Sequence, residues 1–288
     1  MNKIAVILLN YNSSDDCRRC VESLKKQKDV ELEIIIVDNA SHEGDRSTVE
    51  ELCKEQDCTF IVSEENRGYN AGNNIGLRYA ADKGYDFALI ANPDMLFPQS
   101  DYVSTLLETM RKDDDIVVCG SDVVELDGKH LSPMKREGGW EESFAWVKYL
   151  FKKAPAIRED LDSFTESHYC SKLCGCCFML RMDFIQSIHF FDEGVFLFGE
   201  EAILSRQVER SGKKMFYTSE IQALHAHVLS KKGSLENRLK AWKKSRLYFV
   251  EHYSDDGTLG RFVCKLSMNL YFSLLIFKNK IKNLKNAK

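Results

Sequence analysis

The stretch LIANPDMLF, residues 89–97, contains an apolar run that stops at Asn92-Pro93-Asp94 and then resumes. Proline fixes the backbone and has no N–H to donate, so a strand that enters this stretch ends there. Asp94 is therefore expected at the rim of a sheet. A carboxylate at a rim can hold a divalent cation together with substrate phosphates, or it can form part of a Pro-Asp turn.

Strands and helices alternate on both sides of this stretch. The predicted strands are short apolar runs, at Lys3–Leu9, Glu33–Val37, Thr59–Val62, Phe87–Ala91 and Ile116–Gly120. The predicted helices between them are Asp15–Gln27, Ser47–Glu55, Ala71–Asp82 and Tyr102–Arg111. This alternation predicts an α/β fold with a largely parallel sheet that helices cover on both faces.

Polar side chains follow the predicted strands at the points where the strands end. They are Asn10-Tyr11-Asn12, Asp38-Asn39, Glu65-Asn66-Arg67 and Asn92-Pro93-Asp94. In α/β sheets ligands bind beyond the carboxyl ends of the strands. The sequence therefore predicts a binding site at this edge. A carboxylate such as Asp38 could accept hydrogen bonds from a base or ribose there, or could serve a turn.

The segment GYNAGNNIG, residues 68–76, opens a predicted helix and contains three glycines. Glycine permits close approach of a ligand, and a helix N-terminus favours anions. The segment matches neither the G-x-G-x-x-G fingerprint nor a phosphate-loop motif. Most such segments are turns.

Two acids and two histidines complete the candidate site. Glu200 and Glu201 begin a predicted helix (residues 200–211), where acids stabilise the helix dipole or one of them could take a proton from a hydroxyl. His225 and His227 follow a predicted strand at Lys214–Thr218. On an extended segment these two histidines share a face, and one of them could bind a metal that Asp94 already holds.

The composition is that of an ordinary globular protein. The net charge of −4 gives no basic field that would favour nucleic acid. The ten cysteines, without a secretion signal, indicate reduced thiols in the cytosol. Four of them, at residues 170, 174, 176 and 177, have a spacing that matches no usual zinc pattern, so buried thiols are expected.

The C-terminal part differs from the rest. A long helix is predicted over Leu235–Tyr253, and the apolar run FVCKLSMNLYFSLLIF, too short to span a bilayer, is followed by KNKIKNLKNAK. An apolar helix with a lysine-rich tail is typical of a membrane-surface anchor, although a helix docked on the domain is the alternative. We expect a cytoplasmic protein that could associate peripherally with the inner face of the cell membrane.

Taken in order, seven segments resemble the family 2 glycosyltransferases of the GT-A fold, and most closely their rhamnosyltransferase-like branch. The segments are LLNYNS (8–13), IIIVDNAS (34–41), ENRGYNAGNNIGL (65–77), NPD (92–94), CGCCFMLR (174–181), FDEGVFLFGEE (191–201) and HAHVLS (225–230). The resemblance implies a GT-A domain over residues 1–232, with a Rossmann-like mixed sheet flanked by helices. Residues 233–288 are expected to form a helical extension with a basic tail.

The resemblance also implies roles for individual residues. The nucleobase pocket would be lined by Asn10, Tyr11 and Asp38. The ribose and diphosphate would lie along Arg67, Asn70, Gly72 and Asn73, with Asn92 on the ribose side.

The remaining implied roles concern chemistry. Asp94 is the surviving acid of the family's D-x-D motif and would carry Mn²⁺ or Mg²⁺, with His225 as the second ligand and His227 a less favoured one. The family's Glu-Asp pair appears here as Glu200-Glu201. Its second acid is the usual base, so Glu201 is expected in that role and Glu200 is the alternative. The family often has an aspartate where this chain has Ile203.

An inverting, metal-dependent transfer of a sugar from dTDP-rhamnose or a UDP-sugar to a glycan or lipid-linked oligosaccharide follows from the resemblance, as in bacterial surface polysaccharide synthesis. Residues 122–170 could fold over the donor and exclude water. A non-catalytic nucleotide-sugar or glycan-binding module with a decayed site is the main alternative. A nucleotidyltransferase is disfavoured because NYNSSDD after the first strand lacks glycine.

Overall fold

We describe the fold from a computed structural model of the 288-residue chain, in which residues 3–136, 144, 162–226 and 235–286 are described. The strands are β1 (Lys3–Asn10), β2 (Glu31–Asn39), β3 (Thr59–Ser63), β4 (Phe87–Ala91), β5 (Met95–Leu96), β6 (Ile116–Glu125), β7 (His168–Cys170), β8 (Cys177–Arg181) and β9 (Lys214–His225). The helices are α1 (Ser14–Leu24), α2 (Glu43–Gln56), α3 (Tyr69–Asp82), α4 (Tyr102–Arg111), α7 (Met182–Ser187), α8 (Glu200–Arg210), α9 (Leu235–His252) and α10 (Thr258–Asn286).

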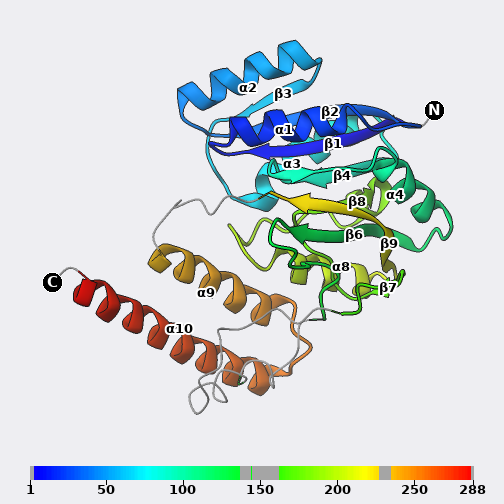
Figure 1. The fold of residues 1–288 in the computed structure, drawn as a ribbon. Coiled ribbons are helices and arrows are strands. Elements are labelled where there is room, and N and C mark those ends of the chain that lie inside the picture. The colour runs from blue at the N-terminus through cyan, green and yellow to red at the C-terminus, as the bar shows by residue number, and fades with distance from the viewer. Residues whose placement is uncertain (1–2, 137–143, 145–161, 227–234, 287–288) are drawn as a thin grey trace.

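The described strands form one mixed sheet in the order β3-β2-β1-β4-β8-β6-β9-β5, with β7 paired to β9 (Figure 1). Strands β1 to β4 pair in parallel, as the alternation predicts. Strand β8 lies antiparallel between β4 and β6, and β9 is parallel to β6. The prediction of a GT-A-like mixed sheet flanked by helices is therefore confirmed.

Helices cover both faces of the sheet because successive strand residues point to opposite sides. On one face α1, α2 and α4 pack against side chains such as Val6 and Ile36. On the other face α3, α7 and α8 pack against side chains such as Ile7 and Val37. The strands buried on both faces are thus near-continuous apolar runs, as their sequence requires.

Two strands extend further than their apolar runs predict. Strand β6 continues from Gly120 to Glu125, and β9 continues from Thr218 to His225. The two strands pair along their length, with an irregularity between Ser121 and Asp122. His225 therefore belongs to β9 itself, whereas the sequence placed it beyond the strand. His227 and residues 137–143 and 145–161 of the expected loop lie outside the described residues.

The two C-terminal helices form an antiparallel pair beside the sheet (Figure 1). Helix α9 shares a hydrophobic cluster with α8, and α10 packs on α9. The sequence has no uninterrupted apolar run of spanning length. However, one described helix is long and apolar enough to cross a membrane by length and composition, at Thr258–Ile281 with a mean hydropathy of 1.2.

Candidate active site

The candidate residues meet at one edge because the strands that carry them run in the same direction. Strands β1, β2 and β4 are parallel to one another. Strand β8 is antiparallel to both β4 and β6, so β6 runs in the same direction as β4. Strand β9 is parallel to β6 and therefore shares this direction. Their carboxyl ends place Asn10, Asp38, Asn92 and His225 along this edge.

Asp94 and His225 come together through the short strand β5. Met95 pairs with His225, and the N–H of Ala226 donates to the carbonyl of Asp94 at 2.8 Å. This pairing holds His225 Nε2 3.3 Å from Asp94 Oδ2, with side chains 16% and 18% exposed. Burial disfavours the imidazolium, but the hydrogen bond to Asp94 and its charge outweigh burial and raise the pKa of His225 above its ordinary value.

The pair fits the demands of a divalent cation that also binds substrate. Two atoms that share one cation at about 2.1 Å each lie roughly 3 Å apart, which is close to the observed Nε2–Oδ2 separation. Among the described residues, no group of three or more His, Cys, Asp or Glu side chains could hold a metal. Asp94 and His225 would therefore supply two ligands, and phosphate oxygens and water the others.

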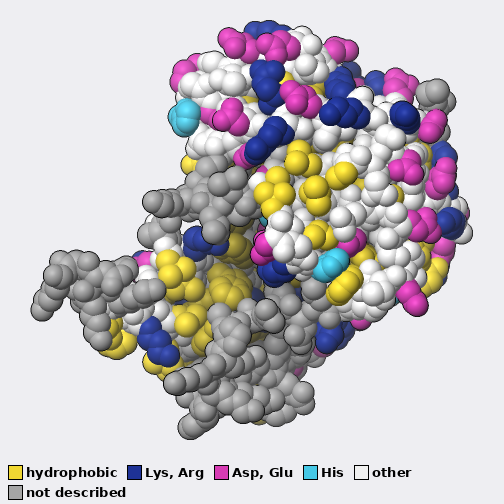
Figure 2. All heavy atoms as spheres, viewed as in Figure 1, with side chains coloured by type: hydrophobic (Ala, Val, Ile, Leu, Met, Phe, Trp, Pro, Cys, Tyr) yellow, Lys and Arg dark blue, Asp and Glu magenta, His cyan; other side chains and the backbone are white. Residues whose placement is uncertain are grey.

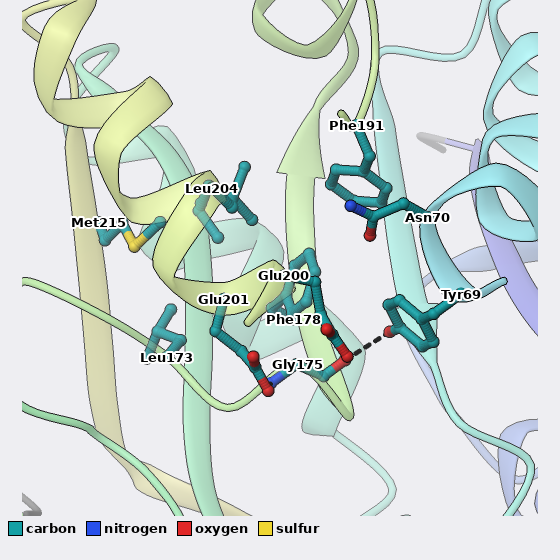
Figure 3. Close-up of a pocket in the computed structure, with 11 residues that line it drawn as sticks. Tyr69, Asn70, Leu173, Gly175, Phe178, Phe191, Glu200, Glu201, Leu204 and Met215 are labelled. Carbon is teal, nitrogen blue, oxygen red and sulfur yellow. Dashed lines mark hydrogen bonds between the residues drawn. The ribbon is translucent and has the colours of Figure 1, made fainter. Parts of the chain in front are cut away.

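The two glutamates lie at the start of α8, which Gly199 precedes in a left-handed conformation (φ 82°). Both carboxylates point toward the Gly175 loop and Tyr69 (Figure 3). Glu201 Oε1 lies 3.4 Å from the N–H of Gly175, and a Cβ on Gly175 would come within 2.9 Å of the same oxygen. Glycine at position 175 thus lets the carboxylate lie over the backbone.

Tyr69 fixes the other side of this loop. Its hydroxyl donates to the carbonyl of Gly175 at 2.5 Å, and burial together with Glu200 raises the pKa of the phenol well above its usual value. The phenol therefore stays protonated and remains a donor. These residues line a narrow pocket whose interior holds about 10 Å³, the space for about one water.

A short path of backbone contacts joins the two halves of the site. The N–H of Asn92 donates to the carbonyl of Cys176 at 2.8 Å, and Cys176 directly follows Gly175, which contacts Glu201. The NPD segment and the first turn of α8 are thus held against the same loop. The metal-binding candidates and the candidate base therefore lie on one rim.

Asn10 and Asp38 are fully buried and bound to each other. Asn10 Nδ2 contacts Asp38 Oδ1 at 3.0 Å and Asp45 Oδ2 at 2.8 Å. Asp38 Oδ2 accepts from the N–H of Ser41 and from Arg46 Nε, both at 3.1 Å. This network fixes the ends of β1 and β2. Their role toward a nucleobase remains a prediction, and Tyr11 is the neighbouring side chain that is open to solvent, at 46% exposed.

The asparagines of α3 hold the loop that precedes α8. Asn70 Nδ2 donates to the carbonyl of Asp192 at 2.6 Å, and Arg67 forms an ion pair with Glu193 at 2.8 Å. Asn73 Nδ2 donates to the carbonyl of Tyr69, while its buried Oδ1 has no hydrogen-bond partner within the described part of the chain. Gly72 allows α3 to approach β1, since a Cβ there would lie 2.4 Å from Leu9 Cδ1. The ligand roles of these residues remain predictions.

The cysteine cluster serves packing around the loop. Cys174 and Cys176 have their Sγ atoms 3.1 Å apart, and Cys177 Sγ lies 3.4 Å from the hydroxyl of Tyr102. All three thiols are free, and burial raises the pKa of Cys177 to about 12. The contact with Cys174 and burial also hold the pKa of Cys176 well above its ordinary value, so Cys176 and Cys177 are protonated at neutral pH.

Sequence reasoning did not single out Tyr69, Gly175 or Asp192. All three lie within the segments that carry the family resemblance. Their spacing gives no sign that they meet, because the contacts join segments far apart in the chain. Asp192 accepts from the hydroxyls of Tyr248 and Tyr253 and so ties the loop to α9.

Comparison with known proteins identifies glycosyltransferases, in agreement with the resemblance noted in the sequence. Residues 5–188 match the model of glycosyl transferase family 2. A low-salt glycan biosynthesis hexosyltransferase, Agl10 of Haloferax volcanii, is 23% identical over 78% of this chain and 67% of its own length. Rhamnosyltransferase WbbL of Escherichia coli is 20% identical over 77% of this chain and 83% of its own.

Two solved structures share the fold. The mannosyltransferase PcManGT from Pyrobaculum calidifontis, in complex with GDP-Man and Mn²⁺, has a TM-score of 0.58 at 17% identity, covering 93% of this chain and 69% of that chain. GalNAc-T7 with UDP, GalNAc and Mn²⁺ has a TM-score of 0.62 at 15% identity, covering 93% and 54%. Some relatives are much longer: the matched part is 33% of putative glycosyltransferase EpsH of Bacillus subtilis.

Proposed function

The chain belongs to glycosyl transferase family 2, and we propose that it transfers a sugar, with inversion, from a nucleotide-sugar donor to a glycan or lipid-linked acceptor in a metal-dependent reaction. The observation that carries the proposal is the Asp94–His225 pair, 3.3 Å apart at the carboxyl edge of the sheet. The loop at residues 174–176 links this pair to the two glutamates.

Asp94 and His225 would hold Mn²⁺ or Mg²⁺. A divalent cation bound there offsets the charge that develops on a diphosphate leaving group. The Mn²⁺ present in PcManGT and in GalNAc-T7 supports this choice of cation. A carboxylate oxygen and an imidazole nitrogen together suit Mn²⁺ better than Mg²⁺, which prefers oxygen ligands.

Glu201 is the residue we assign as general base. It would take the proton of an acceptor hydroxyl, whose oxygen then attacks the anomeric carbon on the face opposite the diphosphate, so configuration inverts. The N–H of Gly175 keeps the carboxylate at the pocket rim, and Tyr69 holds Gly175 in place. Glu200, whose carboxylate is beside it in Figure 3, is the alternative base.

The departure at Ile203 has a structural explanation that leaves this assignment intact. Ile203 is fully buried and packs with Val195 and Phe249, between α8 and α9. An aspartate there would lie in this apolar cluster. The absence of that acid therefore reflects docking of α9 and does not by itself indicate a decayed site.

The donor is proposed to be dTDP-rhamnose or a UDP-sugar. The similarity to rhamnosyltransferase WbbL supports the first, and the UDP bound in GalNAc-T7 supports the second. The similarity to Agl10, named for glycan biosynthesis, supports a glycan acceptor.

The test is release of nucleoside diphosphate by purified protein from a panel of dTDP- and UDP-sugars, with Mn²⁺, with Mg²⁺ or with chelator. Asp94→Ala and Glu201→Gln are measured beside the wild type. We expect release from one donor that requires the cation and is lost in both variants. Nucleotide binding without release, even with membrane extract added as acceptor, would favour a binding module instead.

A further inference from the structure

Helix α10 has an exposed apolar stripe along its length. The stripe consists of large side chains on one face: Leu259, Phe262, Leu266, Leu270, Phe277 and Ile281. Leu259 is 76% exposed, Phe262 64% and Leu266 62%. At 1.5 Å per residue the stripe is ~33 Å long. A contiguous exposed apolar surface of this length marks an interaction site.

The opposite face of α10 is already used. Cys264, Met268 and Phe272 are buried in a cluster with Trp242 and other residues of α9. Leu266 lies two residues from both Cys264 and Met268, so it points about 200° away from them. The stripe therefore faces away from α9.

The charges of α10 indicate what kind of partner binds the stripe. Helix α10 contains no Asp or Glu, and its basic residues are Arg261, Lys265, Lys278, Lys280, Lys282 and Lys285. Figure 2 shows lysine and arginine side chains next to hydrophobic ones over α9 and α10. The charges beside the stripe have a single sign, and Lys278 and Lys280 are exposed near its C-terminal end. An anionic lipid surface attracts such lysines and accepts apolar side chains.

We propose that α10 lies in the plane of an anionic bilayer surface, with the stripe inserted among the lipids. A spanning orientation conflicts with the packing. Lys265 is ion-paired with Glu251 of α9, and a spanning α10 would carry this pair into the hydrocarbon core. An in-plane helix keeps both charges on the protein side.

This docking would fix the orientation of the active site. The hydroxyl of Tyr248 contacts Asp192, and Ser245 Oγ donates to the carbonyl of Leu197 at 2.8 Å, so α9 is bound to the loop that leads into Glu200 and Glu201. A membrane-bound α10 thereby holds the catalytic rim in a fixed orientation relative to the surface. Membrane binding by α10 requires neither donor nor acceptor.

The test is flotation of the full chain with vesicles of phosphatidylcholine, with or without phosphatidylglycerol. The wild type is expected to float with the anionic vesicles, to be released by high salt or by alkaline carbonate, and to bind the neutral ones weakly. Phe262→Glu with Leu266→Glu should lower partitioning by about tenfold or more. The matched control is Leu126→Glu, because Leu126 is 67% exposed and lies far from α10 in the sequence, and its binding should be unchanged.

Several outcomes would overturn the proposal. They are failure of the wild type to bind anionic vesicles, equal binding by the stripe variant, and resistance to carbonate, which indicates a spanning helix. A dimer in light scattering that the stripe variant abolishes would show a second copy as the occupant. Donor cleavage in solution should be unchanged in the stripe variant, so this result is separate from that of the proposed function.

Discussion

His225 Nε2 lies 3.3 Å from Asp94 Oδ2, although the two residues are in distant parts of the sequence. The contact exists because β5 pairs antiparallel with the end of β9. A carboxylate and an imidazole held this way, both largely buried, are the pair that we propose as the cation site at the carboxyl edge of the sheet.

Replacement of either proposed ligand should weaken the apparent affinity for the cation in donor cleavage. Asp94→Asn and His225→Ala are each expected to raise the Mn²⁺ concentration for half-maximal activity by about tenfold or more, since even residues outside the first coordination shell change metal affinity by about that factor. The measurement is a Mn²⁺ titration of nucleoside diphosphate release. His189→Asn is the control: His189 is exposed, and asparagine tolerates its positive φ of 61°. Unchanged cation dependence in both variants would place the metal elsewhere.

The two adjacent glutamates should differ in their effect on turnover. Glu201→Gln is expected to lower kcat by about 10²–10⁴ because the amide cannot accept the acceptor proton. Donor binding should change little, since glutamine has nearly the same size and keeps one oxygen that can accept from the N–H of Gly175. Glu200→Gln is the matched control and should lower kcat by less than about tenfold. The opposite ranking would assign the base to Glu200.

Asp192 should contribute to stability through α9. Its carboxylate accepts from Tyr248 at 2.9 Å, from Tyr253 at 2.5 Å and from the N–H of Gly194 at 2.7 Å. Asp192→Asn turns charged hydrogen bonds into neutral ones and places an NH₂ against donors. We expect the free energy of unfolding in urea to fall by about 1–3 kcal/mol. Asp57→Asn, at a left-handed helix end that suits asparagine, should change it little. Equal effects of the two substitutions would show that Asp192 does not anchor α9.

The sequence predicts the first half of the fold well because its strands are apolar on both faces. Such apolar runs can be recognised from local composition. The predicted bounds of β1 to β4 and of the helices between them therefore agree with the structure to within a few residues. The antiparallel insertion of β8 between β4 and β6 was not visible, since the neighbours of a strand are set by long-range pairing. Strand β9 was predicted too short because TSEIQALH mixes polar and apolar residues. Its extension to His225 depends on pairing with β6, which is also long-range.

The candidate site was predicted as a set of residues at one edge but not as a set of contacts. The strand ends converge as expected, because parallel strands finish at the same side. The loop at Gly175 could not be anticipated as the link between Asn92 and Glu201, since the loop makes both contacts through its own backbone groups. Ile203 was noted as a departure, but its reason emerged only with the packing of α9.

Glu33 should make stability depend on pH at acid values. Partial burial opposes ionisation, but hydrogen bonds from Tyr85, Lys3, Tyr79 and Thr59 outweigh it and lower the pKa of Glu33 from 4.5 to about 2. Because the folded pKa is depressed, the stabilisation is fully present above 4.5 and is lost as pH falls toward about 2. Glu33→Gln should therefore be less stable than wild type near neutral pH, and the difference should shrink across this window. Urea unfolding of both proteins at several pH values tests this, and a difference independent of pH would contradict it.

Gly72 offers a test of whether the glycines of α3 serve packing. A Cβ at position 72 would lie 2.4 Å from Leu9 Cδ1 and 2.9 Å from Leu9 Cδ2, so Gly72→Ala must push α3 away from β1 or force Leu9 off its rotamer. Overpacking of this kind costs about 1–3 kcal/mol, and the free energy of unfolding should fall by that amount.

The matched control for Gly72 is another helical glycine. A Cβ on Gly44, in the first turn of α2, would approach the His42 ring no closer than 3.7 Å, which is ordinary contact. Gly44→Ala should leave stability unchanged or raise it by up to about 1 kcal/mol, because alanine is the better helix former. If Gly72→Ala were as stable as Gly44→Ala, close packing of α3 on β1 would not depend on Gly72. Lost donor binding by a Gly72→Ala protein of wild-type stability would then indicate that the glycine makes room for a ligand.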